Sequence, residues 1–181
     1  MRTLFVTIVL LLPLWGCSPS EEQQPFPEKE APSFTGTDQQ GNAFSTSQLK
    51  GKVWLASFFF TSCQTVCPTL NTEQQKLVQT YGDKIKFVSI STDPDNDTGA
   101  VLLNYAQSFG ASPGVWWMIH MPSDQVRALA TTGFNLMDPK EPEMHSTRFI
   151  AIGADGMIKG YFSGTDSLGI TKLTTWINSQ L

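Results

Sequence analysis

The feature that most constrains this chain is an apolar run that leads into a pair of cysteines. Residues 53–60 read Val-Trp-Leu-Ala-Ser-Phe-Phe-Phe, without the spacing of a helix. An apolar run of this length is typical of a strand buried on both faces. Cys63 and Cys67 follow it, and Pro68 then occupies a position that proline favours in the first turn of a helix. The sequence therefore predicts a central strand, a cysteine-bearing turn and a helix.

The rest of the chain alternates between strand patterns and helix patterns. A hairpin is predicted over residues 34–45, with its turn at Gln40–Asn42. Further strands are predicted at 85–91, 115–119, 147–152 and 157–162, and helices at 68–81, 98–109, 123–131 (with Ser123 as N-cap) and 168–177. Such alternation favours an α/β fold whose parallel sheet is covered by helices on both faces. The last two strands flank the turn 154–156, and this terminal hairpin is expected to add an antiparallel strand.

Length and composition indicate a single domain, over residues 34–181. The chain has 181 residues, of which 40% are hydrophobic, so it can bury a core of ordinary size. Its formal net charge is -4, and no run of Lys or Arg is present. Nucleic acid and an anionic membrane surface are therefore excluded as electrostatic partners.

The N-terminal residues predict export and a lipid anchor. Residues 1–16 carry one arginine and an apolar stretch of the length found in signal peptides. Leu14-Trp15-Gly16-Cys17 resembles a bacterial lipobox, so Cys17 is the expected lipidation site, on the periplasmic side of a bacterial membrane. The alternative is an uncleaved signal anchor in which Cys17 is a spare thiol. Residues 17–33 are polar and proline-rich, and they are expected to form a flexible tether.

Three chemistries are open to Cys63 and Cys67, which the prediction places beside the positive end of a helix dipole, where thiolates are favoured. They can form a redox-active disulfide, bind a soft ion such as Cu(I), or be inert core cysteines. In an oxidising compartment, a dithiol persists only with a reductant or a metal. The chain has two histidines. His145, in a polar loop before a late strand, is a candidate third ligand, whereas His120 is expected to be a partly exposed loop residue.

Three segments together resemble the Sco/SenC family. They are GKVWLASFFFTSCQTVCPTL (51–70), SISTDPDNDT (89–98) and HSTRFIAIGADG (145–156), in the family's order and spacing. The resemblance covers roughly residues 32–180. It implies a thioredoxin-like fold, with a central mixed sheet flanked by helices, in a membrane-tethered protein that serves copper delivery to cytochrome c oxidase. The family usually has a transmembrane anchor, from which the lipobox departs.

The resemblance also implies a set of site residues. Cys63 and Cys67 would be the copper-binding, redox-active thiols, and His145 would complete a site for Cu(I) or Cu(II). Asp93 matches an acidic position near the site, although it is equally suited to forming a turn. Asp95 and Asp97 are expected to be solvated turn and cap groups. The family does not require Met144, whose sulfur is a soft donor.

Two functions compete, and His145 distinguishes them. A copper metallochaperone would pass copper from this site to the copper-site subunit of cytochrome c oxidase. A thiol-disulfide reductase would instead use Cys63 and Cys67 to reduce that subunit's cysteines, with a reductant protein to regenerate the dithiol. Only the first function needs His145. A third role, in peroxide defence or redox sensing, has little support, because Thr61 and Thr65 are the only nearby groups that could activate an oxidant.

Overall fold

The computed structural model describes residues 29–136 and 146–181. The strands are β1 (Lys29–Glu30), β2 (Thr35–Thr37), β3 (Ala43–Ser45), β4 (Trp54–Phe59), β5 (Lys86–Ser91), β6 (Trp116–Ile119), β7 (Arg148–Ile152) and β8 (Met157–Ser163). The helices are α1 (Val66–Tyr81), α2 (Gly99–Phe109), α3 (Ser123–Ala128) and α4 (Ser167–Ser179), with a 3-10 helix η1 (Thr46–Leu49) and a π-helical turn η2 (Leu129–Gly133). The predictions for the signal peptide, Cys17, Met144 and His145 lie outside the described residues.

Six strands form a mixed sheet in the order β1-β8-β7-β4-β5-β6. β4 pairs in parallel with β5, and β5 pairs in parallel with β6. On its other side β4 pairs antiparallel with β7, which continues antiparallel to β8. The α/β class, the mixed sheet and the antiparallel strand from the terminal hairpin are confirmed.

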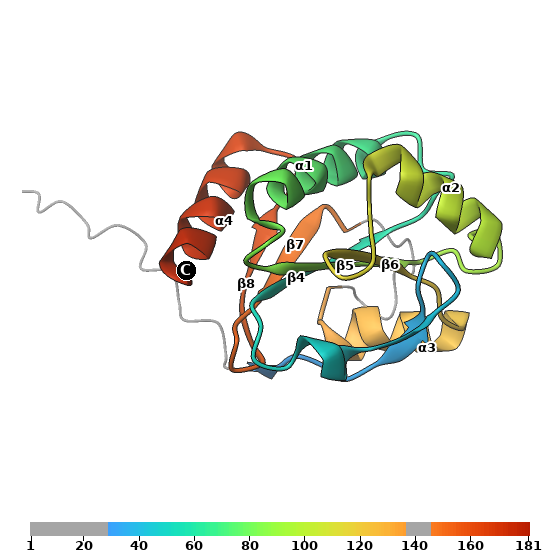
Figure 1. Cartoon of the computed structure of the whole chain (residues 1–181), viewed down its shortest axis with the longest axis horizontal. Coiled ribbons are helices and arrows are strands. Elements are labelled where there is room, and N and C mark those ends of the chain that lie inside the picture. Colours follow the sequence, from blue (N-terminus) through green and yellow to red (C-terminus); the bar gives the residue numbers. More distant parts are fainter. Residues whose placement is uncertain (1–28, 137–145) are drawn as a thin grey trace, which may run out of the picture.

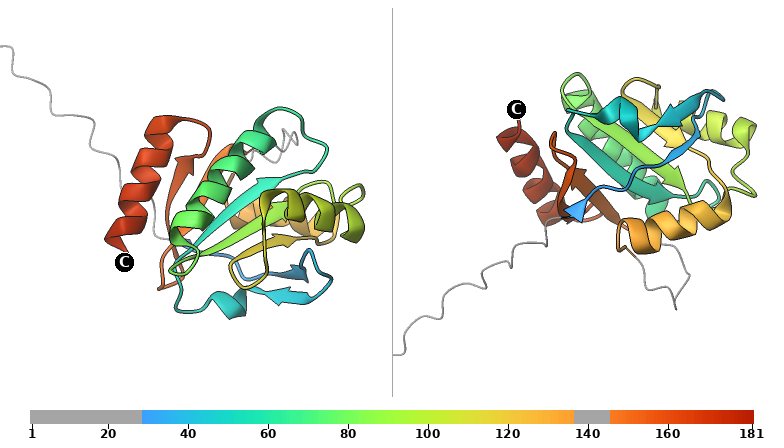
Figure 2. Two further views of the ribbon diagram at one scale, coloured as in Figure 1. Left: turned by 45° about the horizontal axis from the view of Figure 1, so that its top comes forward. Right: turned by 90° about the horizontal axis from the view of Figure 1, so that it is seen from below.

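Helices cover both faces of this sheet (Figures 1 and 2). We call the side covered by α1, α2 and α4 the α1 face, and the side covered by α3, η1 and the β2–β3 hairpin the α3 face. Every residue of β4 is buried, as predicted. Its side chains alternate, so that Leu55 and Phe59 enter the core of the α1 face whereas Trp54 and Phe58 enter that of the α3 face.

The predicted N-terminal hairpin is confirmed as a separate two-stranded sheet that lies against the edge of β6. Thr37 and His120 exchange backbone hydrogen bonds of 2.9 Å in both directions. The buried side chain of Gln39 extends this contact, because Nε2 donates to the carbonyl oxygen of Trp116 (3.0 Å) and Oε1 accepts from the backbone N–H of Met118 (2.9 Å). Gln39 thus takes the place of a further strand beside β6.

Two details differ from the expected boundaries. Ser123 is not an N-cap: Pro122 is the capping residue and Ser123 begins α3, because the carbonyl oxygen of Pro122 accepts the first helical hydrogen bonds, from Gln125 and Val126. Lys29 and Glu30, expected in the tether, form the edge strand β1 along β8. None of the helices within the described residues is both long and apolar enough to cross a membrane.

Candidate metal-binding and redox site

The two cysteines lie where β4 passes into α1. Cys63 is in the connecting turn, and Cys67 is the second residue of α1. Both are free thiols, with only 6% and 4% of their surface exposed. The backbone N–H of Cys67, at the start of the helix, donates to the sulfur of Cys63 at 3.4 Å. The predicted strand, cysteine turn and helix are confirmed, except that α1 begins at Val66, so that Cys67 lies in the first turn of the helix and not before it.

The environment of Cys63 favours its thiolate. Burial alone raises the pKa of this thiol, but hydrogen bonds from the Cys67 thiol and from the backbone of Thr65 and Cys67 outweigh burial and lower the pKa to about 7. The Thr65 hydroxyl, 3.7 Å from the Cys63 sulfur, acts in the same direction. Near neutral pH, about half of Cys63 is therefore ionised and available as a nucleophile or soft ligand.

Cys67 has the opposite character. Burial raises its pKa most, the hydrogen bond to Cys63 raises it further, and the charges of Cys63 and Asp97 add to the effect, so that the pKa reaches about 12. Cys67 is consequently protonated at neutral pH and donates to Cys63. The sequence could not tell which cysteine would attack a disulfide, whereas this asymmetry points to Cys63.

The sheet topology bears on the predicted ligand His145, which lies outside the described residues. β7 runs antiparallel to β4, with Ala56 opposite Ile150 and Trp54 opposite Ile152. The chain therefore enters β7 at the edge of the sheet where β4 leaves toward the cysteines. The described chain resumes at Ser146, immediately before this entry. His145 as a copper ligand stays a prediction.

His120 is partly exposed, as expected, at the end of β6. Its Nε2 lies 3.1 Å from the carbonyl oxygen of Pro94, so the ring contacts the β5–α2 loop. Within residues 29–136 and 146–181, no three His, Cys, Asp or Glu side chains are grouped so as to hold a metal ion.

Asp93 closes a turn in the β5–α2 loop. Its carboxylate accepts from Nδ2 of Asn96 at 3.0 and 2.9 Å, and its carbonyl oxygen accepts from the backbone of Asn96 and Asp97. These are the contacts of a turn-forming residue, and the second proposed role of Asp93, beside the thiols, stays a prediction. Asp95, in the same loop, is exposed as expected.

Asp97, expected to be solvated, is fully buried. Its carboxylate accepts hydrogen bonds from the hydroxyl of Thr61 (2.5 Å), the hydroxyl of Ser91 (2.5 Å) and the backbone N–H of Thr61 (3.2 Å). The expectation was wrong because three aspartates in one polar loop look alike in sequence, and only the turn closed by Asp93 directs Asp97 inward. The α2 N-cap is Thr98, without a side-chain hydrogen bond.

Sequence reasoning also missed Asn71 and Tyr105, beside the thiols. Asn71, one helical turn after Cys67, is fully buried and donates from Nδ2 to the Tyr105 hydroxyl at 2.9 Å. Tyr105 stacks on Phe59 with ring centroids 5.3 Å apart. Burial chiefly raises the pKa of Tyr105 to about 12, and the nearby cysteines and Asp97 add to the increase. A polar residue at a helical core position, such as Asn71, was the available signal.

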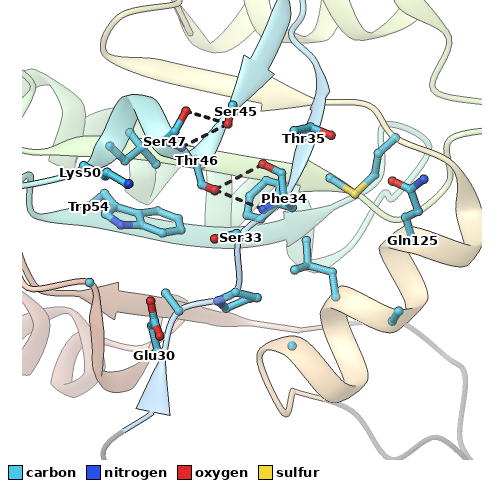
Figure 3. Close-up of a pocket in the computed structure, with 18 of the residues that line it drawn as sticks. Glu30, Ser33, Phe34, Thr35, Ser45, Thr46, Ser47, Lys50, Trp54 and Gln125 are labelled. Atoms are coloured by element: carbon cyan, nitrogen blue, oxygen red, sulfur yellow. Dashed lines mark hydrogen bonds between the residues drawn. The ribbon is translucent and has the colours of Figure 1, made fainter.

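A second concave region lies on the α3 face, away from the cysteines. This groove has a volume of about 1000 Å³ and is lined by the segment after β1, η1, α3 and the β7–β8 turn. Phe34 and Trp54 are among the residues that line it (Figure 3), and Phe34 is held by hydrogen bonds between its backbone and the Thr46 hydroxyl. Among the described residues that line it, none is a cysteine or histidine.

Comparison with known proteins identifies the family. The family model described as SCO1/SenC matches residues 22–177, which is most of the chain. The chain belongs to the SCO1/SenC family. Its fold is accordingly the thioredoxin-like fold of Sco proteins, as the resemblance implied.

Three solved Sco structures are especially informative. A SCO1/SenC family lipoprotein from Bacillus anthracis has a TM-score of 0.76 and 29% identity, over 87% of this chain and 98% of that one. BsSco, described as having a disulfide switch and as a member of a family of cytochrome c oxidase assembly proteins, has a TM-score of 0.73 and 26% identity, over 89% and 98%. ScoI from Bradyrhizobium japonicum, with copper bound, has a TM-score of 0.67 and 26% identity, over 84% and 100%. Family membership thus supports a role in copper handling and oxidase assembly.

Proposed function

We propose that this protein binds copper through Cys63, Cys67 and His145 and delivers it to the binuclear copper centre of cytochrome c oxidase. The observation that carries the proposal is the hydrogen-bonded thiol pair at the edge of the sheet where the chain enters β7. Two thiolates and an imidazole suit Cu(I), and they can also hold Cu(II). The copper bound to the Bradyrhizobium relative supports the same cargo here.

The two thiols have different parts in copper capture. Cys63, with a pKa of about 7, is the first ligand, because half of it is already ionised near neutral pH. Cys67, with a pKa of about 12, must release its proton when copper binds. Transfer to the oxidase then proceeds by exchange of one thiolate at a time, and proton return to Cys67 favours release of the ion.

Thiol-disulfide reduction is the second candidate function. It is favoured by the difference in pKa between the Cys63 and Cys67 thiols. The Cys63 thiolate would attack a disulfide of the oxidase subunit, forming a mixed disulfide and releasing one substrate thiolate. Cys67 would then lose its proton and attack the Cys63 sulfur, which releases the second substrate thiolate and leaves a Cys63–Cys67 disulfide. Two electrons pass to the substrate, so a separate reductant protein must restore the dithiol.

We further propose that Cys17 is lipidated and holds the domain on the periplasmic side of a bacterial membrane. The lipobox-like residues Leu14 to Cys17 support this, as does the lipoprotein description of the Bacillus anthracis relative. Labelling with a radioactive fatty acid in a bacterial host should mark the wild-type protein and not Cys17→Ser. Equal labelling of both would contradict the anchor.

Copper binding tests the leading function. Cu(I) and Cu(II) affinities are measured on the full-length reduced protein by competition with a chromophoric chelator. His145→Ala should lose most of the affinity, whereas Gln125→Ala, which changes an exposed residue of the groove on the α3 face, should keep it. If copper binds weakly and both variants match the wild type, the site is a dithiol and the reductase function replaces the chaperone.

A further inference from the structure

Asp97 contributes a buried carboxylate to the structure beside the thiols. It has no exposed surface, and every partner of its two oxygens is a hydrogen-bond donor: the backbone N–H and hydroxyl of Thr61 and the hydroxyl of Ser91. Burying a carboxylate is costly unless it is fully hydrogen-bonded, and here the donors come from the β4–α1 loop and from Ser91, the last residue of β5. Asp97 therefore joins the β5–α2 loop to the β4–α1 loop.

The partner loop is the one that carries the cysteines. Thr61 lies two residues before Cys63, and the backbone N–H of Cys63 donates to the carbonyl oxygen of Phe60 at 3.3 Å. Asp97 thus holds Thr61 within the turn that determines the position of the Cys63 thiol. Thr61 donates to Asp97 from both its backbone N–H and its hydroxyl. These hydrogen bonds, which we call the clamp, therefore fix the backbone of Thr61 as well as its side chain.

The loop that carries Asp97 is itself firmly attached. The backbone N–H of Thr92 donates to the carbonyl oxygen of Phe59 at 2.8 Å, which continues the β4–β5 pairing into the loop. The contact between His120 and Pro94 and the turn closed by Asp93 hold its middle. The carboxylate consequently projects from a rigid support, as positioning of a reactive group requires.

We propose that Asp97 is a positioning residue for the thiol pair: it clamps Thr61 and thereby holds Cys63 within reach of Cys67 for copper capture and disulfide closure. The proposal rests on the thiol site of the proposed function and adds the residue that organises it. Asp97 forms no hydrogen bond with either sulfur, so it positions the thiols through Thr61, and its charge separately raises the pKa of Cys67.

The sign of the effect separates this role from a purely electrostatic one. A negative charge near the thiols opposes formation of a second thiolate. If charge were the only influence of Asp97, its removal would strengthen Cu(I) binding to the dithiolate. A positioning role predicts the reverse, because a loosened turn must be ordered again before both sulfurs can reach one ion.

The test compares three variants of the full-length protein with the wild type. Asp97→Asn keeps the shape, removes the charge and replaces one of the two acceptor oxygens with an amide nitrogen that cannot accept from Thr61 or Ser91. Thr61→Val removes the hydroxyl donor, and the charge of Asp97 stays. Asp95→Asn is the matched control, because it changes the same charge on an exposed residue of the same loop. The readouts are Cu(I) affinity by chelator competition and the rate of Cys63–Cys67 disulfide closure after reaction with oxidised glutathione, a step that needs no copper.

Asp97→Asn should weaken Cu(I) binding at least tenfold and slow closure of the Cys63–Cys67 disulfide about fivefold. Thr61→Val should have the same effects to a smaller extent. Asp95→Asn should match the wild type. Tighter Cu(I) binding by Asp97→Asn, or behaviour equal to Asp95→Asn, overturns the proposal. If Asp97→Asn does not fold, Thr61→Val decides, and wild-type values for it overturn the clamp. If the wild type binds no copper, the proposed function fails, and closure rates alone decide the role of Asp97.

Discussion

The two faces of the central sheet differ in what they bury. The core of the α3 face consists of apolar side chains, among them Phe58, Ile90 and Phe134. The α1 face also buries a polar network, in which the hydroxyl of Ser89 contacts Ser57 (2.8 Å), Nε2 of Gln74 (2.9 Å) and Nε1 of Trp116 (2.9 Å). The same strands thus face an apolar core on one side of the sheet and a core with hydrogen-bonded polar side chains on the other.

The polar groups of the α1 face lead toward the thiols. Ser89 and Ser91 are two residues apart on β5 and therefore point to the same face, and Ser91 donates to Asp97 beside the cysteine loop. Buried polar networks specify a unique arrangement where every member is satisfied. We infer that the α3 face mainly stabilises the fold, whereas the α1 face also sets the geometry of the site.

The largest effect is expected from the α3 face. Phe58 is 1% exposed and packs edge-on against Phe134, with ring centroids 5.9 Å apart. Phe58→Ala should lower the free energy of unfolding by about 3–5 kcal/mol, measured by urea denaturation. The rate at which iodoacetamide alkylates Cys63 in the folded fraction should stay at the wild-type value. A changed alkylation rate would show that the faces are not separable.

A smaller loss of stability is expected from the α1 face. Ser89→Ala leaves the donors of Gln74 and Trp116 without their acceptor, so it should cost about 2 kcal/mol in urea denaturation. Ser57→Ala, which removes one member and leaves the Ser89 hydroxyl in place, is the matched control and should cost about 1 kcal/mol. Equal losses of unfolding free energy in the two variants would contradict the inference that Ser89 is the central residue of the polar network.

The pH dependence of alkylation should separate the two thiols. Cys63 modification should rise with a midpoint near pH 7, whereas Cys67 should stay unreactive until strongly alkaline pH. Peptide mass spectrometry after timed iodoacetamide treatment measures both. A shared midpoint near 9 would contradict the asymmetry.

The same pKa values set the sign of the effect on stability. The pKa of Cys63 is lower in the folded protein, so its ionisation adds stability that is fully present above about pH 9 and lost as pH falls through 7. The pKa of Cys67 is higher in the folded protein, so its contribution is present below pH 9 and lost as pH rises toward 12. Between pH 7 and 9, the reduced wild type should gain stability relative to Cys63→Ser in urea denaturation.

The smallest effect is expected at the groove of the α3 face. Gln125 lines this groove from α3 and is exposed. Gln125→Ala should change the free energy of unfolding by less than about 0.5 kcal/mol, since an exposed surface substitution leaves the core intact. Thermal unfolding and the Cys63 alkylation rate should both match the wild type. A large change in either would assign the groove a part in stability or in the thiol chemistry.

The sequence predicted the elements of the fold well because apolar periodicity and turn residues are local signals. The buried strand 54–59, the cysteine turn and the helix that contains Pro68 follow from neighbouring residues alone. The edge strand β1 was missed because two residues carry too little pattern, and its partner β8 is more than a hundred residues away in sequence.

The site was predictable in its reactive residues and not in its supports. Cys63 and Cys67 are conspicuous by their type and by the proline that follows. Asp97 resembles Asp93 and Asp95 in sequence, and only the folded loop distinguishes the buried carboxylate from the exposed one. The unequal pKa values also depend on burial and hydrogen bonds across the turn, which spacing does not encode.

The side chain of Gln39 has a consequence for encounters between copies of the protein. The outer strand of a sheet offers unpaired backbone groups on which another chain can assemble. On β6 these groups are already engaged, by Gln39 at Trp116 and Met118 and by Thr37 at His120. The opposite edge, β1, is only two residues long. The β6 edge of the sheet is therefore protected against pairing with the sheet of another copy.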